Sequence, residues 1–165
     1  MRILRRSFLL SISAFCIFLP RRVSSADGTD TTVEMRNFHP TDEKARMVFY
    51  PRIVVVQPGE TVLFKATDRG HNSASIEGMI PDGAAAWDGA ISEDIAVSFT
   101  VPGFYGHVCT PHESVGMVGL VVVEGPGKLD NLESARAVRH RGRAKRIWGE
   151  IWAQAEADGL LEHSG

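Results

Sequence analysis

The stretch GFYGHVCTPHESVGMVGLVVV, residues 103–123, decides the fold. Residues 104–108 and 118–123 are short apolar runs of the kind that form buried strands, and Val101-Pro102-Gly103 is a turn before the first of them. Between the two runs lies CTPHESVGM, residues 109–117, with the spacing Cys-x2-His-x4-Met. A loop held at both ends by strands keeps its side chains in fixed positions. The stretch therefore predicts a β-protein with a binding site in this loop.

The surrounding sequence, residues 31–124, also has the pattern of a β-protein. We expect strands at 32–35, 47–50, 53–56, 61–65 and 94–100, where polar and apolar residues alternate or apolar runs are bounded by Gly and Pro. Pro51 should bend the chain between two of them, and residues 78–91 should form a loop with a short helical turn. Short strands at this spacing favour an all-β, Greek-key sandwich that covers residues 27–127.

The character of the chain changes after Gly125-Pro126-Gly127, and residues 128–165 predict a helical extension. One helix is expected at 131–140, Gly142 should break it, and a second helix is expected at 143–157. The second helix carries a stripe of apolar residues at helical spacing: Ala144, Ile147, Trp148, Ile151, Trp152 and Ala155. We interpret this stripe as the face that packs on the sandwich. A helix that binds a partner or a membrane surface is the alternative.

The first 26 residues have the pattern of a secretory signal peptide, with cleavage expected after Ala26. A basic start is followed by an uncharged apolar run at 7–19 and by the small residues Ser24-Ser25-Ala26. The run is too short to span a bilayer of roughly 30 Å, so we expect no stable membrane insertion, although a retained anchor is the alternative. Arg5-Arg6 is compatible with twin-arginine export as well as with the general secretory route. Export predicts a periplasmic protein.

Charge and cysteine content narrow the function of the exported part. The signal holds five arginines and no acid, so 13 of the 18 basic residues remain beside all 20 acidic ones, a formal net charge of −7. This balance argues against nucleic acid as a partner. Cys109 is the only cysteine after residue 26. Because a lone thiol in an oxidising compartment is a liability, Cys109 should be either buried and inert or bound to something.

The loop and one upstream residue supply a complete set of metal ligands. Cys109, His112 and Met117 lie in the loop, and His71 follows the strand expected at 61–65. Each residue alone has an ordinary explanation, as a core thiol, a loop histidine or a core methionine. Together, a thiolate, two imidazoles and a weak axial thioether are the donor set of a blue copper site. The pattern predicts one type 1 copper per chain.

Several motifs resemble those of the pseudoazurins, small blue copper proteins of the cupredoxin family. They are Met47-Val48-Phe49, Gln57-Pro58-Gly59-Glu60-Thr61-Val62, Gly70-His71-Asn72, Met79-Ile80-Pro81-Asp82-Gly83-Ala84, the Cys-Thr-Pro-His loop and Gly116-Met117. The pair of C-terminal helices is a further similarity, and the resemblance covers nearly the whole exported chain.

The resemblance implies an eight-stranded cupredoxin sandwich with His71, Cys109, His112 and Met117 as copper ligands. It implies a monomeric electron carrier rather than an enzyme, which shuttles single electrons between redox partners such as a cytochrome and a copper nitrite reductase. By the same resemblance, Asn72 should brace the ligand loops by hydrogen bonds. Met47 should pack beside His112. The alternatives are a simple turn contact for Asn72 and ordinary core packing for Met47.

The sequence departs from the family where a partner would dock. Pseudoazurins usually surround the copper end with lysines, whereas this chain has Val108 before the cysteine, Glu77 after His71-Asn72, and Glu113 after His112. We therefore expect weakened or reversed steering toward an acidic partner, which leaves a basic partner open. His107, two residues before Cys109, should point to the same side of its strand. We expect it to be satisfied or partly buried, with a proton-linked role as the alternative.

Two other functions can be weighed from the sequence. Copper enzymes with several copper sites place a histidine directly beside the cysteine, but Val108 and Thr110 flank Cys109, and no second set of three histidines is visible. A binuclear copper centre would need a second cysteine. A copper-binding protein for storage or delivery stays open, and the colour of the oxidised copper-loaded protein would discriminate it from an electron carrier.

Overall fold

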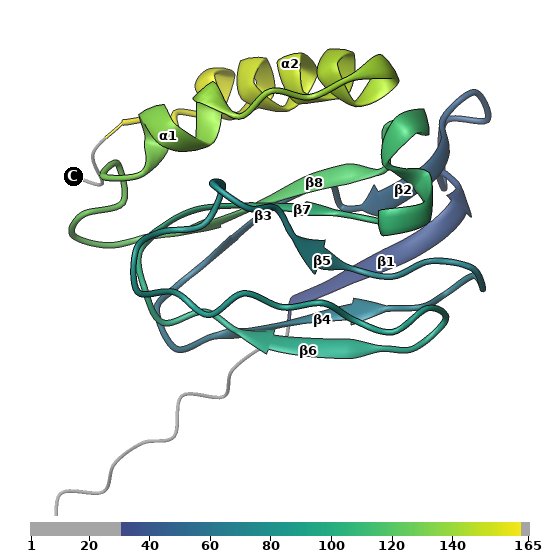
Figure 1. Ribbon diagram of the computed structural model, residues 1–165, viewed down its shortest axis with the longest axis horizontal. Coiled ribbons are helices and arrows are strands. Elements are labelled where there is room, and N and C mark those ends of the chain that lie inside the picture. Colours follow the sequence, from purple (N-terminus) through teal and green to yellow (C-terminus); the bar gives the residue numbers. More distant parts are fainter. Residues whose placement is uncertain (1–30, 163–165) are drawn as a thin grey trace, which may run out of the picture.

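The computed structural model describes residues 31–162, which form two four-stranded sheets with two helices on one side (Figure 1). The strands are β1 (Thr31–Phe38), β2 (Arg46–Tyr50), β3 (Ile53–Val56), β4 (Thr61–Lys65), β5 (Ala74–Ser75), β6 (Ile95–Ser98), β7 (Gly103–Val108) and β8 (Val118–Val123). The first sheet has the order β2-β1-β4-β6 and the second β3-β8-β7-β5. The predicted signal peptide lies outside the described residues.

Strand pairing follows the turns that the sequence predicted. The chain leaves the first sheet after β2 and enters the second with β3, so the bend at Pro51 is confirmed as the crossing between the sheets. β1 pairs antiparallel with β2 and parallel with β4, while β7 and β8 form an antiparallel pair. The loop that joins β7 to β8 therefore lies at one end of this pair of strands, and Figure 1 shows it near the β1–β2 connection.

The main core lies between the two sheets and is built from alternating residues. Its buried members are Val33, Met35, Phe49, Val54, Val56, Val62, Phe64, Phe99, Tyr105, Cys109, Met117, Val121 and Val123. Ile95 and Val97 of β6 pack against this core, and Phe99, the residue after β6, is one of its buried members, as the alternation predicted. All six residues of β8 are buried. A strand buried on both faces needs a cover on its outer side.

The helices α1 (Leu132–Ala137) and α2 (Gly142–Ala157) supply this cover. The six stripe residues of α2 are buried and form a second core with Phe104, Val118, Leu120 and Val122. Packing of the stripe on the sandwich is thus confirmed. No helix within residues 31–162 is long and apolar enough to cross a membrane.

Several details differ from the sequence prediction, among them the bounds of β1, which covers 31–38 rather than 32–35, and of β6, which covers 95–98 rather than 94–100. Helix α1 ends at Ala137 rather than near residue 140, because Val138 has an extended backbone, and Gly142 is the first residue of α2. The two-residue strand β5 was missed, since it is too short to show a pattern. Residues 78–91 contain turns and an isolated bridge from Ala74 to Asp88 but no helical turn.

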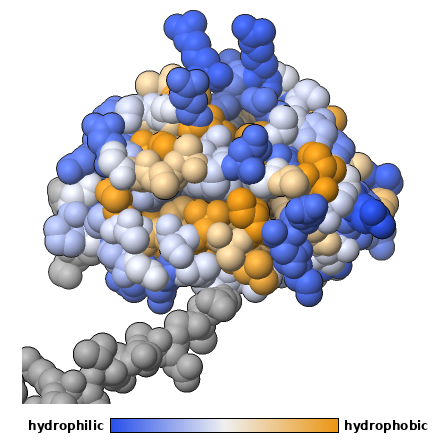
Figure 2. All heavy atoms as spheres, turned by 60° about the horizontal axis from the view of Figure 1, so that its bottom comes forward, coloured by the Kyte–Doolittle hydropathy of each residue, from blue (hydrophilic) through white to orange (hydrophobic). Residues whose placement is uncertain are grey.

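Figure 2 shows the face at the bottom of Figure 1, where a band of apolar residues is bordered by hydrophilic ones.

Candidate metal centre

The loop between β7 and β8 is a short 3-10 helix, η1 (Thr110–Val115), closed by its own backbone. The N–H of Cys109 donates to the carbonyl of Met117 over 3.0 Å, and the N–H of His112 donates to the carbonyl of Cys109 over 2.9 Å. Gly116 ends the turn with a φ of 92°, a left-handed conformation that favours glycine. These bonds hold the three candidate ligands of the loop in a fixed relation.

His71 reaches the loop from the connection between β4 and β5. Its carbonyl accepts a hydrogen bond of 2.7 Å from the N–H of Ser92, and the hydroxyl of Ser92 accepts one of 2.9 Å from the N–H of Gly70. His71 is fully buried. Two hydrogen bonds to Ser92 therefore fix the backbone on which this imidazole is mounted.

The donor atoms of His71, Cys109 and His112 converge, all within 4.8 Å of one another. The two Nδ1 atoms are 3.1 Å apart, and the Cys109 Sγ lies 3.7 Å from that of His71 and 3.3 Å from that of His112. A point equidistant from the three atoms lies about 2.0 Å from each. This is close to the roughly 2.0–2.1 Å of zinc–imidazole bonds and about 0.3 Å shorter than the roughly 2.3 Å of a zinc–thiolate bond, so a metal would lie slightly nearer to the two nitrogens than to the sulfur. The residues present fit a transition metal held in a trigonal plane.

Burial separates the candidate ligands into two kinds. His71, Cys109 and Met117 have no exposed surface, and Cys109 and Met117 belong to the main core. His112 is partly exposed. One imidazole edge is therefore the only part of this set that reaches solvent.

Burial also sets the electrostatics of the site. It raises the pKa of the Cys109 thiol, although the backbone N–H groups of Asn72 and His112 lower it. Burial lowers the pKa of His71, His112 lowers it further, and Asp68 raises it. Both environments disfavour free charged groups, whereas a bound cation favours the thiolate and the neutral imidazole as ligands.

Asn72 joins the two ligand-bearing segments. Its Oδ1 accepts from the N–H of Thr110 over 2.8 Å, and its Nδ2 donates to the Thr110 hydroxyl over 3.1 Å and to the carbonyl of Gly89 over 3.0 Å. The side chain is buried, with 3% of its surface exposed. These contacts link the residue after His71 to the residue after Cys109.

Sequence reasoning missed a second polar contact, from Asn37 at the end of β1. The Asn37 Oδ1 lies 3.0 Å from the Nε2 of His71, and the Asn37 N–H donates to Asp68 over 2.6 Å. An acceptor at Nε2 keeps the imidazole proton there and leaves the Nδ1 lone pair directed at the site. Asn37 is 34 residues away from His71 in the chain. No local spacing could have indicated the contact.

The comparisons with known proteins agree with this geometry. A family model described as copper binding proteins, plastocyanin/azurin family, matches residues 37–124. The pseudoazurin of Methylorubrum extorquens is 38% identical over 131 residues, which are 79% of this chain and 85% of the relative.

The chain belongs to the pseudoazurins. It is thus a copper-binding electron carrier and not an enzyme. Two solved pseudoazurin structures are similar to it. That from Methylobacterium extorquens AM1 has a TM-score of 0.70 and 39% identity, over 76% of this chain and 98% of that one. That from Hyphomicrobium denitrificans has a TM-score of 0.69 and 34% identity, over 76% and 97%. The cupredoxin sandwich is therefore confirmed.

Met47 and His107 are two further residues that the sequence analysis placed near the metal site of this pseudoazurin. Met47 packs on the main core, is partly exposed and has a φ of 52°, a conformation uncommon outside glycine. Its contact with His112 stays a prediction. His107 does point to the Cys109 side, where its ring meets Phe49 and Phe64 edge-on. It is 1% exposed and its Nδ1 has no hydrogen-bond partner in the described structure, so the expected satisfied or partly buried histidine was wrong.

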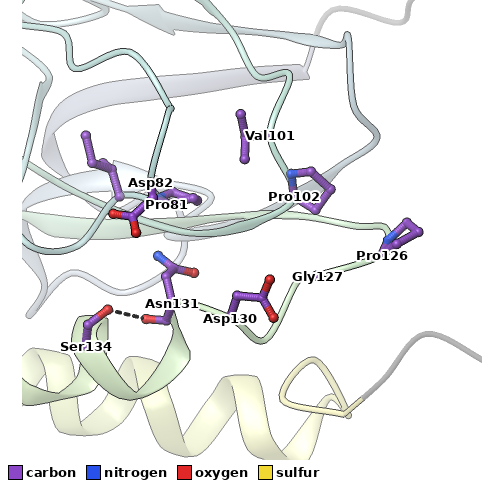
Figure 3. A pocket seen from close by; sticks show the side chains of 10 residues that line it. Pro81, Asp82, Val101, Pro102, Pro126, Gly127, Asp130, Asn131 and Ser134 are labelled. Atoms are coloured by element: carbon purple, nitrogen blue, oxygen red, sulfur yellow. Dashed lines mark hydrogen bonds between the residues drawn. The ribbon is translucent and has the colours of Figure 1, made fainter.

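A hollow at the opposite end of this pseudoazurin serves the fold rather than the metal. Figure 3 shows Asp82, Asp130 and Asn131 around it. Both polar atoms of the buried Asn131 side chain bond the backbone of Phe104, at 3.0 Å and 2.8 Å. The side chain thus ties α1 to β7.

Proposed function

We propose that this protein is a monomeric, periplasmic shuttle that carries one electron at a time on a type 1 copper. His71, Cys109 and His112 would hold the copper through two imidazoles and a thiolate, and Met117 would add a weakly binding thioether. The observation that carries the assignment is the triangle of donor atoms, with sides of 3.1, 3.3 and 3.7 Å around a common centre. Copper supplies the change between Cu(I) and Cu(II).

The protein's own residues keep the site stiff and dry. The backbone bonds that close η1 and the bridges made by Asn72 hold both ligand segments in one geometry. Full burial of Cys109 and Met117 excludes water from the sulfur side. Because the donors have little room to move, the reorganisation that accompanies each change of charge stays small.

The exposure of His112 supports a route for the electron. It is the only one of the four proposed ligands with accessible surface, and its neighbours in η1 from Thr110 to Val115 are also exposed. A partner that covers η1 can approach the imidazole edge. We propose that transfer to partners such as a cytochrome or a copper nitrite reductase takes place across this edge.

The predicted signal peptide supports the periplasmic location. Its basic start, apolar run and small residues before position 27 are the features read by export machinery. Fractionation of the native host separates this location from the alternatives, since a cytoplasmic pool of processed protein would contradict it.

Visible absorption and electron paramagnetic resonance spectra of the copper-loaded protein test the ligand assignment. Wild type should turn blue on oxidation, Cys109→Ser should lose the colour, and His112→Gln should lose or shift it. His39→Gln is the matched control, because His39 lies in the β1–β2 connection and bonds the backbone of Asp42 and Thr41 rather than the site. An equally blue Cys109→Ser variant would disprove the assignment.

The same experiment separates a shuttle from a delivery protein. A shuttle should be oxidised and reduced repeatedly by small redox reagents without loss of copper. A protein that binds copper only as Cu(I), and is colourless or releases the metal on oxidation, would instead support storage or delivery.

A further inference from the structure

A groove lies on the helical side of the molecule, between α1, the connection that follows it, and α2. Figure 1 shows that connection alongside α2. The groove has a volume of about 480 Å³, which is within the range of sites that hold small molecules. Its lining includes Arg136 of α1, Arg139 and His140 of the connection, and Lys145, Trp148 and Trp152 of α2. Three consecutive parts of the chain thus form this one groove, which we call the helix groove.

The charged residues that line the helix groove are all cations. Arg136, Arg139 and Lys145 are exposed, and none of them forms an ion pair within residues 31–162. The Arg136 guanidinium lies over the ring of Trp152, 6.0 Å from its centre, a contact that offers no acceptor to its N–H groups. Because like charges repel one another, an anion placed among the three would be held by all of them.

Two buried ring nitrogens in the same lining also lack a partner. Trp148 is 2% exposed, and neither its Nε1 nor the Nε2 of His140 has a hydrogen-bond partner within the described residues. The two rings stack, with centroids 5.1 Å apart and planes at 22°. An indole N–H can only donate, and leaving a buried donor unpaired is unfavourable. An acceptor that entered the helix groove would remove this cost.

The lining therefore favours one kind of ligand. Guanidinium, ammonium and indole groups donate hydrogen bonds and accept none, and a protonated His140 would donate as well. A cation would be repelled, and a neutral ligand would leave the three charges unpaired. We propose that the helix groove binds a small molecule that carries at least two oxyanion groups, a dicarboxylate or a phosphate ester. Its oxygens accept from the cations and from the indole N–H of Trp148.

This site adds a ligand to the molecule without using the metal centre. Arg136, Arg139 and Lys145 come from α1, the connection and α2, so one bound anion joins all three. His140 covers Trp148 and is only partly buried, and its ring must shift for an oxygen to reach the indole. Because the ligand binds the folded helices, it also stabilises the cover over β8.

Nitrogen–proton correlation NMR of the reduced, copper-loaded protein tests the proposal, since Cu(I) is diamagnetic. The probes are succinate and glycerol 3-phosphate, with sodium chloride at the same ionic strength as the reference. Trp148→Phe keeps an aromatic ring, removes the N–H and identifies its signal among those of the three tryptophans. The second test variant, Arg136→Gln/Lys145→Gln, changes only exposed side chains. Its matched control is Lys44→Gln/Lys65→Gln, which removes two exposed charges outside the helix groove.

We expect the Trp148 indole signal to shift and saturate with at least one probe, while that of Trp87 stays in place. Saturation with succinate alone would indicate a dicarboxylate, and with glycerol 3-phosphate alone a phosphate ester. In calorimetric titrations, Trp148→Phe should bind the probe roughly tenfold more weakly. Arg136→Gln/Lys145→Gln should bind it roughly fivefold more weakly, and the control less than twofold.

Three results would overturn the proposal. They are a shift that sodium chloride reproduces, no saturation with either probe, and equal weakening in Arg136→Gln/Lys145→Gln and its control, which net charge alone would explain. If Trp148→Phe fails to fold, the variant at exposed positions still decides the outcome. Circular dichroism and the blue colour of the oxidised variants verify the fold and the copper site. A wild type that never turns blue would refute the proposed function and leave the anion titration unaffected.

Discussion

The buried His107, two residues before Cys109, should make the protein sensitive to acid. Burial lowers the pKa of His107 from an ordinary 6.5 to about 3. The imidazole is therefore neutral in the folded state while the unfolded chain takes up a proton below pH 6.5. Stability from this residue is complete above that pH and is lost as pH falls toward 3. The loss is about 1.4 kcal/mol per pH unit, or about 3 kcal/mol between pH 7.5 and pH 4.5.

Urea unfolding of the copper-free protein, followed by tryptophan fluorescence at several pH values, measures this effect. We compare wild type with His107→Val, in which the titrating group is gone and all other groups remain. Absolute stability will change with repacking around Phe49 and Phe64, so the slope against pH is the quantity compared. Between pH 7.5 and 4.5 the wild type should lose about 3 kcal/mol more than the variant. Parallel lines for the two proteins would refute the reasoning.

Three other outcomes follow from close contacts and from the metal. Gly116→Ala should lower the free energy of unfolding by roughly 1–3 kcal/mol more than Gly59→Ala, as measured by urea unfolding. Both glycines have a positive φ, but only at Gly116 would the new Cβ meet a side chain, that of Ile147 at 2.8 Å. Equal losses in the two variants would contradict this. Asn131→Ala should cost about 2–4 kcal/mol, since it leaves the buried N–H and carbonyl of Phe104 unpaired, while the blue colour stays; an unchanged midpoint would be evidence against it. When free copper is present at a hundred times its Kd, the free energy of unfolding should be about 3 kcal/mol higher than that of the copper-free protein. An unfolding temperature in calorimetry that is the same with and without copper would argue against a metal bound to the folded state.

Most of the fold could be predicted from the sequence, because the patterns that indicate its strands and helices lie within short stretches of the chain. The bounds expected for β4 and β8 agree with the structure, since both runs are enclosed by turn residues. The apolar stripe of α2 could be read from its period alone. By contrast, β5 consists of two residues whose pairing with β7 depends on tertiary contacts, and α1 ends early for a reason that shows only in the backbone of Val138.

The candidate site divides in the same way. Cys109, His112 and Met117 lie within nine residues, so their spacing was visible, and His71 was recognisable from its place after a strand. The Asn37 contact with His71 joins the end of β1 to the connection between β4 and β5, which is distant from it in the chain. The Nδ1 of His107 has no hydrogen-bond partner in the described structure, and the ring lies against Phe49 and Phe64, which offer none. Such contacts need the three-dimensional structure.

The direction of α2 has a practical consequence for wiring this molecule to an electrode. The helix begins beside η1 and runs away from it, so the end of the described chain lies toward the opposite end of the sandwich (Figure 1). A linker attached after Ala157 would tether the molecule to gold with its imidazole edge facing the solution. Proteins in solution could then exchange electrons with the immobilised layer at this edge. An electron passing directly between the copper site and the gold would instead have to cross the full length of the strands.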